Sequence, residues 1–232
     1  MRQQPEHLRR PRASRAPTTV SARPLDAAAG HQPSRAAGLA SLASAWDSVA
    51  FLKGFFQHPD QVGSVIPSSA VLEAHLVRAA RLEAARSVVE LGPGTGGTTR
   101  AFLRALPARS KLLAIELSPM FHARISALIK DPRFTPQLGS AEQIAEFLAA
   151  WRMPAPDAVI SGIPFSTMPV DVADRIAAAV ASALAPGGRF VAYQVRAHVA
   201  QFATPYLGEP VRQWQWFNVP PVRVFTWTKP PR

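Results

Sequence analysis

The sequence predicts an α/β fold: a mostly parallel sheet of seven strands, with helices on both faces and an antiparallel hairpin at its C-terminal end. Between positions 87 and 195, short β-branched runs alternate with helical segments of about ten or more residues, which is typical of parallel strands joined by crossover helices. Two further extended runs, WQWFNV and VRVFTW, lie between Arg212 and Lys229 and are joined across Pro220-Pro221. We expect these two runs to pair as the hairpin.

The elements follow one another in a regular order. Ser68 or Ser69 is expected to cap a helix that continues to about Ala84, and a strand from Ser87 to Glu90 comes next. Pro186-Gly187-Gly188 ends the last helix of the alternating region. The remaining strands are predicted at 111–116, 133–138, 157–161 and 188–195, and the remaining helices at 98–106, 119–130, 140–150 and 170–185.

The stretch ELGPGTGGTT, from Glu90 to Thr99, follows the first strand and opens a helix. Its glycines allow positive φ angles and let the backbone approach a ligand without an intervening Cβ. No Gly-Lys-Ser/Thr follows, so the loop is not a P-loop, and its glycine spacing also departs from GxGxxG. The loop residues that we assign to cofactor binding are Glu90, Gly92, Pro93, Gly94, Thr95 and Gly96.

Glu90 indicates which cofactor the loop binds, because a carboxylate at this strand end would repel a pyrophosphate and attract a cation. S-adenosylmethionine carries a sulfonium and an ammonium group, so it suits an acidic strand end better than NAD does. The next strand ends in Glu116, about twenty residues after the loop, where an acid is placed to bind ribose hydroxyls. The alternative is that both carboxylates only cap the helices that follow.

Ligands of open α/β sheets bind at the carboxyl ends of the strands, where the strand order reverses. Leu117, Ser140 and Ala141 therefore join the predicted cofactor residues, the last two near the adenine. The loop after the fourth strand is where the substrate is expected to meet the methyl donor, and Ser161 in it is assigned to both sets. The predicted catalytic residues are Ser161, Gly162, Ile163, Pro164, Phe165 and Tyr193.

Methyl transfer requires a neutral amine, so we expect a general base or an acceptor that holds the deprotonated amine. The candidate side chains are Ser161, Ser166, Tyr193, Gln194 and His198. Backbone carbonyl groups of residues 162–164 could orient the amine without any titrating side chain. His198, at the end of a strand, could instead be purely structural.

Composition restricts the partners. The net charge of +11 and the pI near 11.4 favour anionic partners, either nucleic acid or an acidic membrane surface. The absence of cysteine excludes disulfides, thiolate metal sites and cysteine nucleophiles, and no ligand cluster predicts a metal. No apolar run approaches the ~18–20 residues that span a bilayer.

The first 38 residues are rich in Arg, Pro, Ala and Ser without hydrophobic periodicity, so we expect a disordered basic tail and no secretory signal. This tail is a solvated segment, the product of a start codon assigned too far upstream, or an arm that binds anionic surfaces. Residues 39–232 are the predicted domain, which begins with an amphipathic helix at about 41–58. Trp46 and Leu52 lie on one side of that helix, and Phe51 and Phe55 on another. Either both sides are buried, or one contacts a partner or a membrane.

Four stretches together resemble the class I S-adenosylmethionine-dependent methyltransferases and, more narrowly, the bacterial phospholipid N-methyltransferases that convert phosphatidylethanolamine towards phosphatidylcholine. They are FLKGFFQHPDQVGSVIPSS, ELGPGTGGTT, SGIPFSTMP and FNVPPVRVF. The glycine loop is common to all class I enzymes, whereas the other three in this order are selective for the lipid enzymes. The resemblance implies a Rossmann-like fold, S-adenosylmethionine as the cofactor and a phospholipid substrate. It also implies a membrane-bound helix at Trp46 to Phe56, a loop at Pro67-Ser68-Ser69 that helps close the cofactor site, and an enzyme held at the cytoplasmic face of the plasma membrane, without a stable protein partner.

An RNA adenine N-methyltransferase is the alternative. The related rRNA adenine dimethylases usually carry an Asn-Pro-Pro-Tyr-like motif after the fourth strand, and the sequence SGIPF at 161–165 departs from it. A binding module without catalysis is a third possibility, which the intact glycine loop and its acids disfavour.

The same basic and aromatic residues serve either substrate. For a lipid, Arg196, Arg212 and Arg223 would bind a phosphate or an anionic leaflet. For RNA, these cations would bind phosphates, while Trp214, Trp216 and Phe217 would stack on bases.

Overall fold

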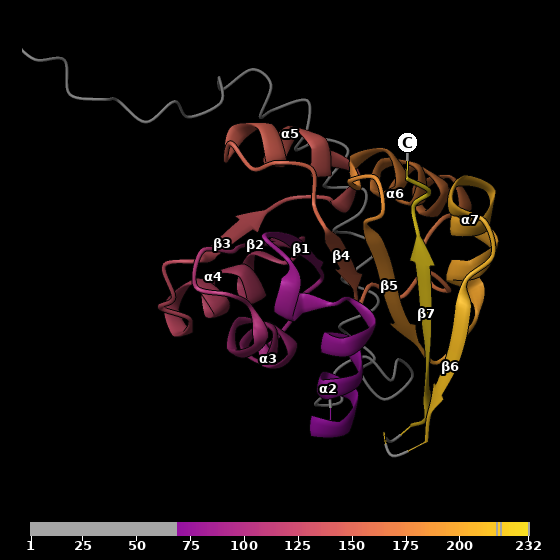
Figure 1. Ribbon diagram of the computed structural model, residues 1–232, viewed down its shortest axis with the longest axis horizontal. Helices are drawn as coiled ribbons and strands as arrows, with labels where there is room; N and C mark the ends of the chain where they lie inside the picture. The colour runs from indigo at the N-terminus through magenta and orange to yellow at the C-terminus, as the bar shows by residue number, and fades with distance from the viewer. Residues whose placement is uncertain (1–68, 217, 219, 232) are drawn as a thin grey trace, which may run out of the picture. The chain divides into compact units, whose positions relative to one another are not determined.

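Seven strands form a single sheet in the order β3-β2-β1-β4-β5-β7-β6, as Figure 1 shows. The computed structural model describes residues 69–216, 218 and 220–231, which belong to one compact unit. Strands β1 to β5 are parallel, β7 is antiparallel to β5, and β6 is antiparallel to β7. The predicted seven-stranded, mostly parallel sheet with an antiparallel C-terminal hairpin is confirmed.

The predicted elements between positions 87 and 195 are all present, and their ends agree within two residues, except that the helix expected at 140–150 begins as a 3-10 turn and becomes an α-helix only at Ile144. The strands are β1 (Ser87–Leu91), β2 (Lys111–Glu116), β3 (Phe134–Leu138), β4 (Ala158–Ser161), β5 (Arg189–Gln194), β6 (Val211–Gln215) and β7 (Val222–Thr228). The helices are α2 (Ala70–Ala79), α3 (Gly97–Ala105), α4 (Pro119–Leu128), α5 (Ile144–Ala150), α6 (Val170–Ala183) and α7 (His198–Leu207), with 3-10 turns η2 (Leu82–Ala84) and η3 (Ala141–Gln143).

Two apolar layers cover the sheet. Helices α2, α3 and α4 pack with Val88 and the residues on its side of the strands, and α5, α6 and α7 pack with Val89 and the residues on the other side. Strands β1 and β4 are buried along their whole length, which explains why they are continuous apolar runs rather than alternating ones. The edge strand β3 contains Pro136, which a strand with only one neighbour tolerates.

Helix N-termini follow the sequence signals. Ser69 caps α2, since its Oγ accepts a hydrogen bond from Leu72 N at 3.2 Å. Ser118 caps α4, where Pro119 occupies the first helical position and has no N–H to leave unpaired. These two caps fix the points at which the chain enters the layer of helices over β1 and β2.

Three expectations about secondary structure are wrong. The first helix ends at Ala79 rather than Ala84, because Arg81 adopts a left-handed conformation with φ of 52° and the chain continues as η2. The first strand of the hairpin, expected at 214–219, lies at 211–215. The sequence analysis also missed α7, although its buried Val199, Phe202 and Leu207 have helical spacing; Pro205 inside the helix obscured that signal.

The predicted basic tail at 1–38, the amphipathic helix at 41–58 and the Pro67-Ser68 part of the predicted closing loop lie outside the described residues. Within the described ranges, none of the helices combines the length and the apolar character that crossing a bilayer requires. These parts of the prediction therefore stay predictions.

Packing between β5 and β7 offers a test of the core. Phe190 is fully buried, and its ring stacks on Trp227 with centroids 5.2 Å apart. We expect Phe190→Ala to lower the free energy of unfolding by about 3–5 kcal/mol in urea titrations, because it leaves a cavity. Trp151→Ala, at a side chain that is 47% exposed, is the control and should cost much less. Equal losses in the two variants would contradict this account of the core.

Candidate active site

Three loops meet at the carboxyl edge of the central strands. Backbone hydrogen bonds continue just past the strand ends: Gly92 N donates to Ile115 O at 2.9 Å, and Gly162 N donates to Leu91 O at 3.0 Å. On the outer side, Gly139 N donates to Glu116 O at 3.0 Å. The strand order reverses at β1, which lies between β2 and β4. The loops after these strands therefore lie where open α/β sheets bind ligands.

The conformation of the glycine loop requires residues without a Cβ. Gly92, Gly94 and Gly96 have φ angles of 72°, 54° and 80°, a region that other residues rarely adopt. A Cβ on Gly92 would lie 3.2 Å from Ile163 Cγ1, so the loop after β1 closely approaches the loop after β4. Between the glycines, Pro93 is buried and Thr95 is exposed.

Glu90 lies beneath this loop rather than on its surface. Its side chain is 2% exposed, and its two carboxylate oxygens accept hydrogen bonds from Thr98 Oγ1 at 2.5 Å and from Thr99 Oγ1 at 2.7 Å. Thr98 and Thr99 belong to the first turn of α3. The carboxylate thus ties the end of β1 to the start of α3 and fixes the loop between them.

Burial dominates the acidity of Glu90. Desolvation raises its pKa to about 7, while the hydrogen bonds from the two threonines lower it and the nearby carboxylate of Glu116 raises it further. A cation bound above the loop would favour the ionised carboxylate. The charge of Glu90 would therefore respond to a cationic ligand near neutral pH.

Glu116 connects the loops after β1 and β2. Its Oε2 accepts a hydrogen bond from Gly94 N at 3.0 Å, and its Oε1 accepts one from Ser118 N at 2.9 Å. The side chain is 6% exposed, and burial raises its pKa against the opposing effect of these backbone donors. Leu117, between Glu116 and Ser118, is half-buried.

The loop after β3 forms a small polar turn. Ser140 and Ala141 are buried at the start of η3. Ser140 Oγ accepts a hydrogen bond from Glu142 N at 3.3 Å, and Gln143 Oε1 accepts one from Ser140 N at 3.4 Å, which together form a capping box. The predicted assignment of both residues to the adenine remains a prediction.

The middle of the predicted catalytic loop is half-buried, and both of its ends are buried. Ser161 is fully buried, and its Oγ accepts a hydrogen bond from Ile163 N at 3.3 Å. Phe165 is also buried, with its ring 6.2 Å from that of Phe202 in α7, so it anchors the loop in the core. Gly162, Ile163 and Pro164 lie between these two anchors and border the glycine loop.

Tyr193 and Gln194 support this loop from opposite faces of β5. A Cβ on Gly162 would lie 2.5 Å from Tyr193 Oη, so residue 162 must be small for the tyrosine to pack beneath it. Burial, followed by the charge of Glu90, raises the pKa of Tyr193 and keeps its hydroxyl protonated at neutral pH. Gln194 Nε2 donates to Ile163 O at 2.5 Å. The other candidate bases differ in exposure: Ser166 is half-buried, and His198 is exposed at the start of α7.

Thr98 and Thr99 are the residues that sequence reasoning missed. Both are buried, and both donate to Glu90. The signal was present, because two adjacent threonines directly follow the last glycine of the loop. A buried acid needs hydrogen-bond donors within reach, and the helix that begins at Gly97, seven residues later, supplies them.

These residues fit S-adenosylmethionine. A Cβ built on Gly94 would meet no heavy atom within 4 Å, so the loop borders open space there. A carboxylate has about four acceptor positions, and Glu116 can therefore accept further hydrogen bonds from ribose hydroxyls while it holds Gly94. Together with Glu90, it gives this edge of the sheet the negative charge that a sulfonium and an ammonium group require.

Replacing Glu116 tests the ribose assignment. We expect Glu116→Gln to weaken S-adenosylmethionine binding about tenfold or more in titration calorimetry, because a hydrogen bond to a charged group is lost. Glu83→Gln, on an exposed residue away from the site, is the control and should leave the affinity unchanged. An unaltered affinity in Glu116→Gln, with the domain folded, would remove the ribose role.

The raised pKa of Glu90 predicts a pH-dependent stability. Between pH 4.5 and about 7 the folded state holds a proton that the unfolded state releases, so this contribution to stability falls as the pH rises through that window. We expect the free energy of unfolding, measured in urea without ligand, to fall between pH 5 and pH 8 by roughly 2–3 kcal/mol more in wild type than in Glu90→Gln. Parallel pH profiles would show that Glu90 titrates normally.

Comparison with known proteins agrees with this geometry. A family model described as a methyltransferase domain matches residues 88–188, from β1 to the residue before β5. The ornithine lipid N-methyltransferase of Singulisphaera acidiphila is 31% identical over 146 residues, which cover 62% of this chain and 76% of that protein.

Solved structures support the fold alone. The O-methyltransferase TomG of Streptomyces achromogenes, in complex with S-adenosylmethionine, has a TM-score of 0.57 and 19% identity over 81% of this chain and 90% of its own. The precorrin-6y C5,15-methyltransferase of Geobacter metallireducens has a TM-score of 0.56 and 17% identity over 70% of this chain and 90% of its own. The sheet order, the acidic glycine loop and the curated relative lead to one conclusion: this chain belongs to the class I S-adenosylmethionine-dependent methyltransferases, and S-adenosylmethionine is its cofactor.

Proposed function

We propose that this methyltransferase transfers a methyl group to the amine of a phospholipid head group, phosphatidylethanolamine in the first instance, at a membrane surface. The observation that carries the proposal is the 31% identity to a lipid N-methyltransferase along most of that protein's length. The loop after β4 adds support, since SGIPF stands where a base methyltransferase would have its Asn-Pro-Pro-Tyr-like motif.

A rigid carbonyl group after β4 is suited to orient an amine. Ile163 O is fixed by Gln194 Nε2 at 2.5 Å. A carbonyl oxygen has two lone pairs, so Ile163 O can accept one further hydrogen bond from an amine N–H, whereas Pro164 O already accepts two, from Thr167 Oγ1 at 3.0 Å and Thr167 N at 3.1 Å. Donation of an amine hydrogen to the fixed carbonyl of Ile163 would direct the nitrogen lone pair towards the glycine loop, and such alignment is a large part of what catalysis requires here.

The cofactor, when bound, supplies a methyl group on a sulfonium sulfur, and the nitrogen–methyl bond forms as the sulfur–methyl bond breaks. The chain's own residues determine how the amine reaches the site unprotonated. Tyr193 cannot serve as a base at neutral pH, because burial and Glu90 keep its hydroxyl protonated. Ser161 is enclosed in the core. We therefore propose that the amine gives up its proton to solvent before it binds, and that the carbonyl of Ile163 orients the neutral form.

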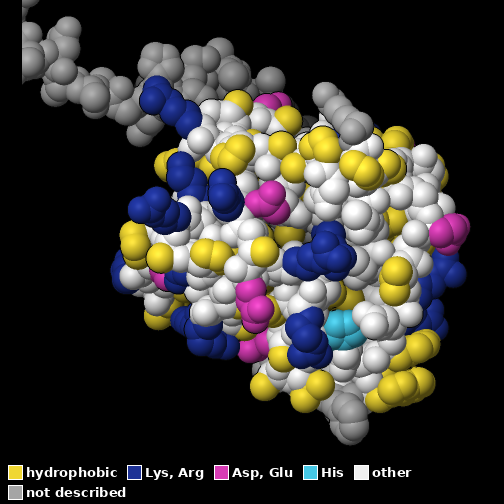
Figure 2. Space-filling model, in the orientation of Figure 1, with side chains coloured by type: hydrophobic (Ala, Val, Ile, Leu, Met, Phe, Trp, Pro, Cys, Tyr) yellow, Lys and Arg dark blue, Asp and Glu magenta, His cyan; other side chains and the backbone are white. Residues whose placement is uncertain are grey.

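A membrane surface is the proposed location of the reaction, on the cytoplasmic side. The basic composition and the predicted amphipathic helix at 41–58 support this, although that helix lies outside the described residues. On the face shown in Figure 2, Lys and Arg side chains form separate groups among hydrophobic and neutral ones. A continuous basic groove, which would favour a single nucleic acid strand, is not seen on that face.

RNA methylation remains the second candidate, because Trp214 and Trp216 stack with centroids 4.8 Å apart and could hold a base. One incubation separates the two functions: the protein with methyl-labelled S-adenosylmethionine, total lipid and total RNA, followed by solvent partition. We expect the label in the organic phase, and chromatography of that phase then identifies the head group. Label confined to the aqueous macromolecular fraction would replace the lipid proposal with the RNA one. The cofactor-site variant Glu116→Gln is the control and should reduce the label in either fraction.

A further inference from the structure

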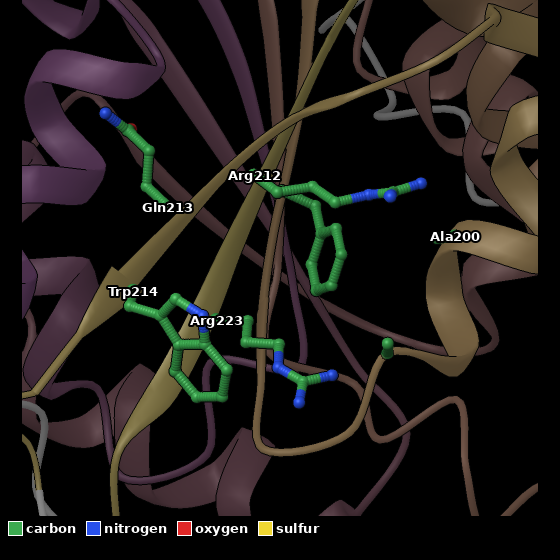
Figure 3. A pocket seen from close by; sticks show the side chains of 7 residues that line it. Ala200, Arg212, Gln213, Trp214 and Arg223 are labelled. Carbon is green, nitrogen blue, oxygen red and sulfur yellow. The ribbon is translucent and has the colours of Figure 1, made fainter.

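A pocket on the C-terminal hairpin is lined by none of the residues that are assigned to the cofactor. It encloses about 450 Å³ between the hairpin strands β6 and β7 and the start of α7. Arg212, Trp214, Arg223 and Phe225 line it from the hairpin, and Ala197 and Ala200 line it from the α7 side. Figure 3 shows both guanidinium groups directed to the side of the hairpin on which Ala200 lies, whereas Gln213 points the other way.

Arg223 is in an unusual state for a cation. Its Nε is buried without a hydrogen-bond partner, and the arginine forms no ion pair with any residue that the structure describes. Its guanidinium carbon lies 4.3 Å from the centre of the Trp214 ring, a cation–π contact that offsets part of the desolvation. A buried donor without an acceptor is costly, so an anion whose oxygen reached this guanidinium group would offset part of that cost.

Arg212 supplies a second positive charge that is only loosely engaged. It pairs with Glu209 at 2.9 Å, but the two side chains are 58% and 73% exposed. Exposed pairs of this kind contribute little free energy, so Arg212 can exchange that partner for a ligand at low cost. Arginine suits the task because its planar donors match the oxygens of a phosphate or a carboxylate.

The pocket is linked to the candidate active site through strand β5. Arg223 lies opposite Gln194 in the β5–β7 pairing, and Gln194 holds Ile163 O in the loop after β4. Neighbouring strands lie about 4.8 Å apart, so Arg223 is one strand away from the residue that supports this loop. Trp214 and Trp216, which are 44% and 65% exposed at the rim, have the amphipathic character that suits a lipid interface.

The hairpin is held rigidly from its opposite face. His75 of α2 contacts the side chains of Gln213, at 2.7 Å, and of Gln215. Near the hairpin turn, Asn218 Oδ1 accepts a hydrogen bond from Ser69 N at 3.3 Å, and Asn218 Nδ2 donates to Pro220 O at 3.1 Å. These contacts pre-organise Arg223 and Trp214, so little ordering is needed when a ligand binds.

From these observations we infer that the Arg212–Arg223–Trp214 pocket binds the anionic group that the substrate carries beside its amine, so that the enzyme selects amine lipids that carry an anion over amine lipids without one. This inference rests on the proposed lipid methyltransferase function and specifies its substrate. The anion is a phosphodiester in phosphatidylethanolamine and a carboxylate in an amine lipid built on an amino acid. Either one places two or more oxygens before the guanidinium groups.

The test compares wild type with Arg223→Gln in the full-length chain. Binding of dihexanoyl phosphatidylethanolamine, below its micelle concentration, is followed by titration calorimetry and by tryptophan fluorescence. We expect Arg223→Gln to weaken binding about tenfold or more and to raise KM with little change in kcat, since uniform binding is lost. Arg223→Lys should recover part of the loss. The control Arg104→Gln, at an exposed arginine of α3, should behave as wild type.

Three lipids resolve the chemistry of the anion. Phosphatidylethanolamine carries a phosphate, Nα-palmitoyl lysine carries a carboxylate, and hexadecylamine carries an amine without an anion. Wild type should methylate one or both of the first two better than hexadecylamine, and Arg223→Gln should remove that preference. An unchanged affinity and KM in Arg223→Gln, or equal use of hexadecylamine by wild type, would overturn the inference while the lipid function stands.

Two further outcomes are informative. If wild type methylates no lipid yet binds dihexanoyl phosphatidylethanolamine through Arg223, the proposed function fails and the anion site remains. If Arg223→Gln instead loses affinity for a labelled RNA oligonucleotide and keeps its affinity for the lipid, the pocket is a nucleic acid site and the inference is overturned.

Discussion

The burial of one carboxylate, Glu90, is the constraint on which the site depends. A charge enclosed at the end of the central strand must be satisfied locally, and Thr98 and Thr99 do so from the first turn of α3. Because strand and helix are fixed to the same side chain, the loop between them has little freedom. Its glycines then adopt the positive φ angles that bring backbone rather than side chains to the ligand.

The loop after β4 receives its support from the opposite direction. Phe165 anchors it in the layer that contains α7, and Gln194 holds it through Ile163 O. Tyr193 packs beneath Gly162 and is held protonated partly by the charge of Glu90. The side of the site that receives the cofactor and the side that receives the amine are therefore coupled through strands β1 and β5, and neither is an independent loop.

The sequence predicted the sheet well because its strands are continuous apolar runs bounded by glycine and proline. It also predicted that Glu90 and Glu116 would occur together at one edge, since parallel strands end at the same side. It did not predict that Glu90 would face inward, because that depends on α3 folding back over β1. Phe165 and Gln194 posed the same difficulty: Phe165 was expected at the substrate, Gln194 was one candidate whose direction depended on the strand register, and only tertiary packing reveals that each supports the loop. The helix α7 was missed since Pro205 dominated a weak periodic signal.

Charge is distributed unevenly along the sheet, and this asymmetry would orient the head group of the substrate. The acids Glu90 and Glu116 lie on β1 and β2, whereas Arg223 and Arg212 lie on β7 and β6, with the loop after β4 between the two sets. A head group that carries an anion beside its amine has one favourable direction in such a field, with its anion towards the arginines and its amine towards the loop after β4. An amine without an anion lacks the contact with the arginines and can approach in many poses. The acids attract the cationic methyl donor to one end of the sheet, and the arginines would align the methyl acceptor from the other end. The reacting nitrogen would thus be brought to the glycine loop without a dedicated basic side chain.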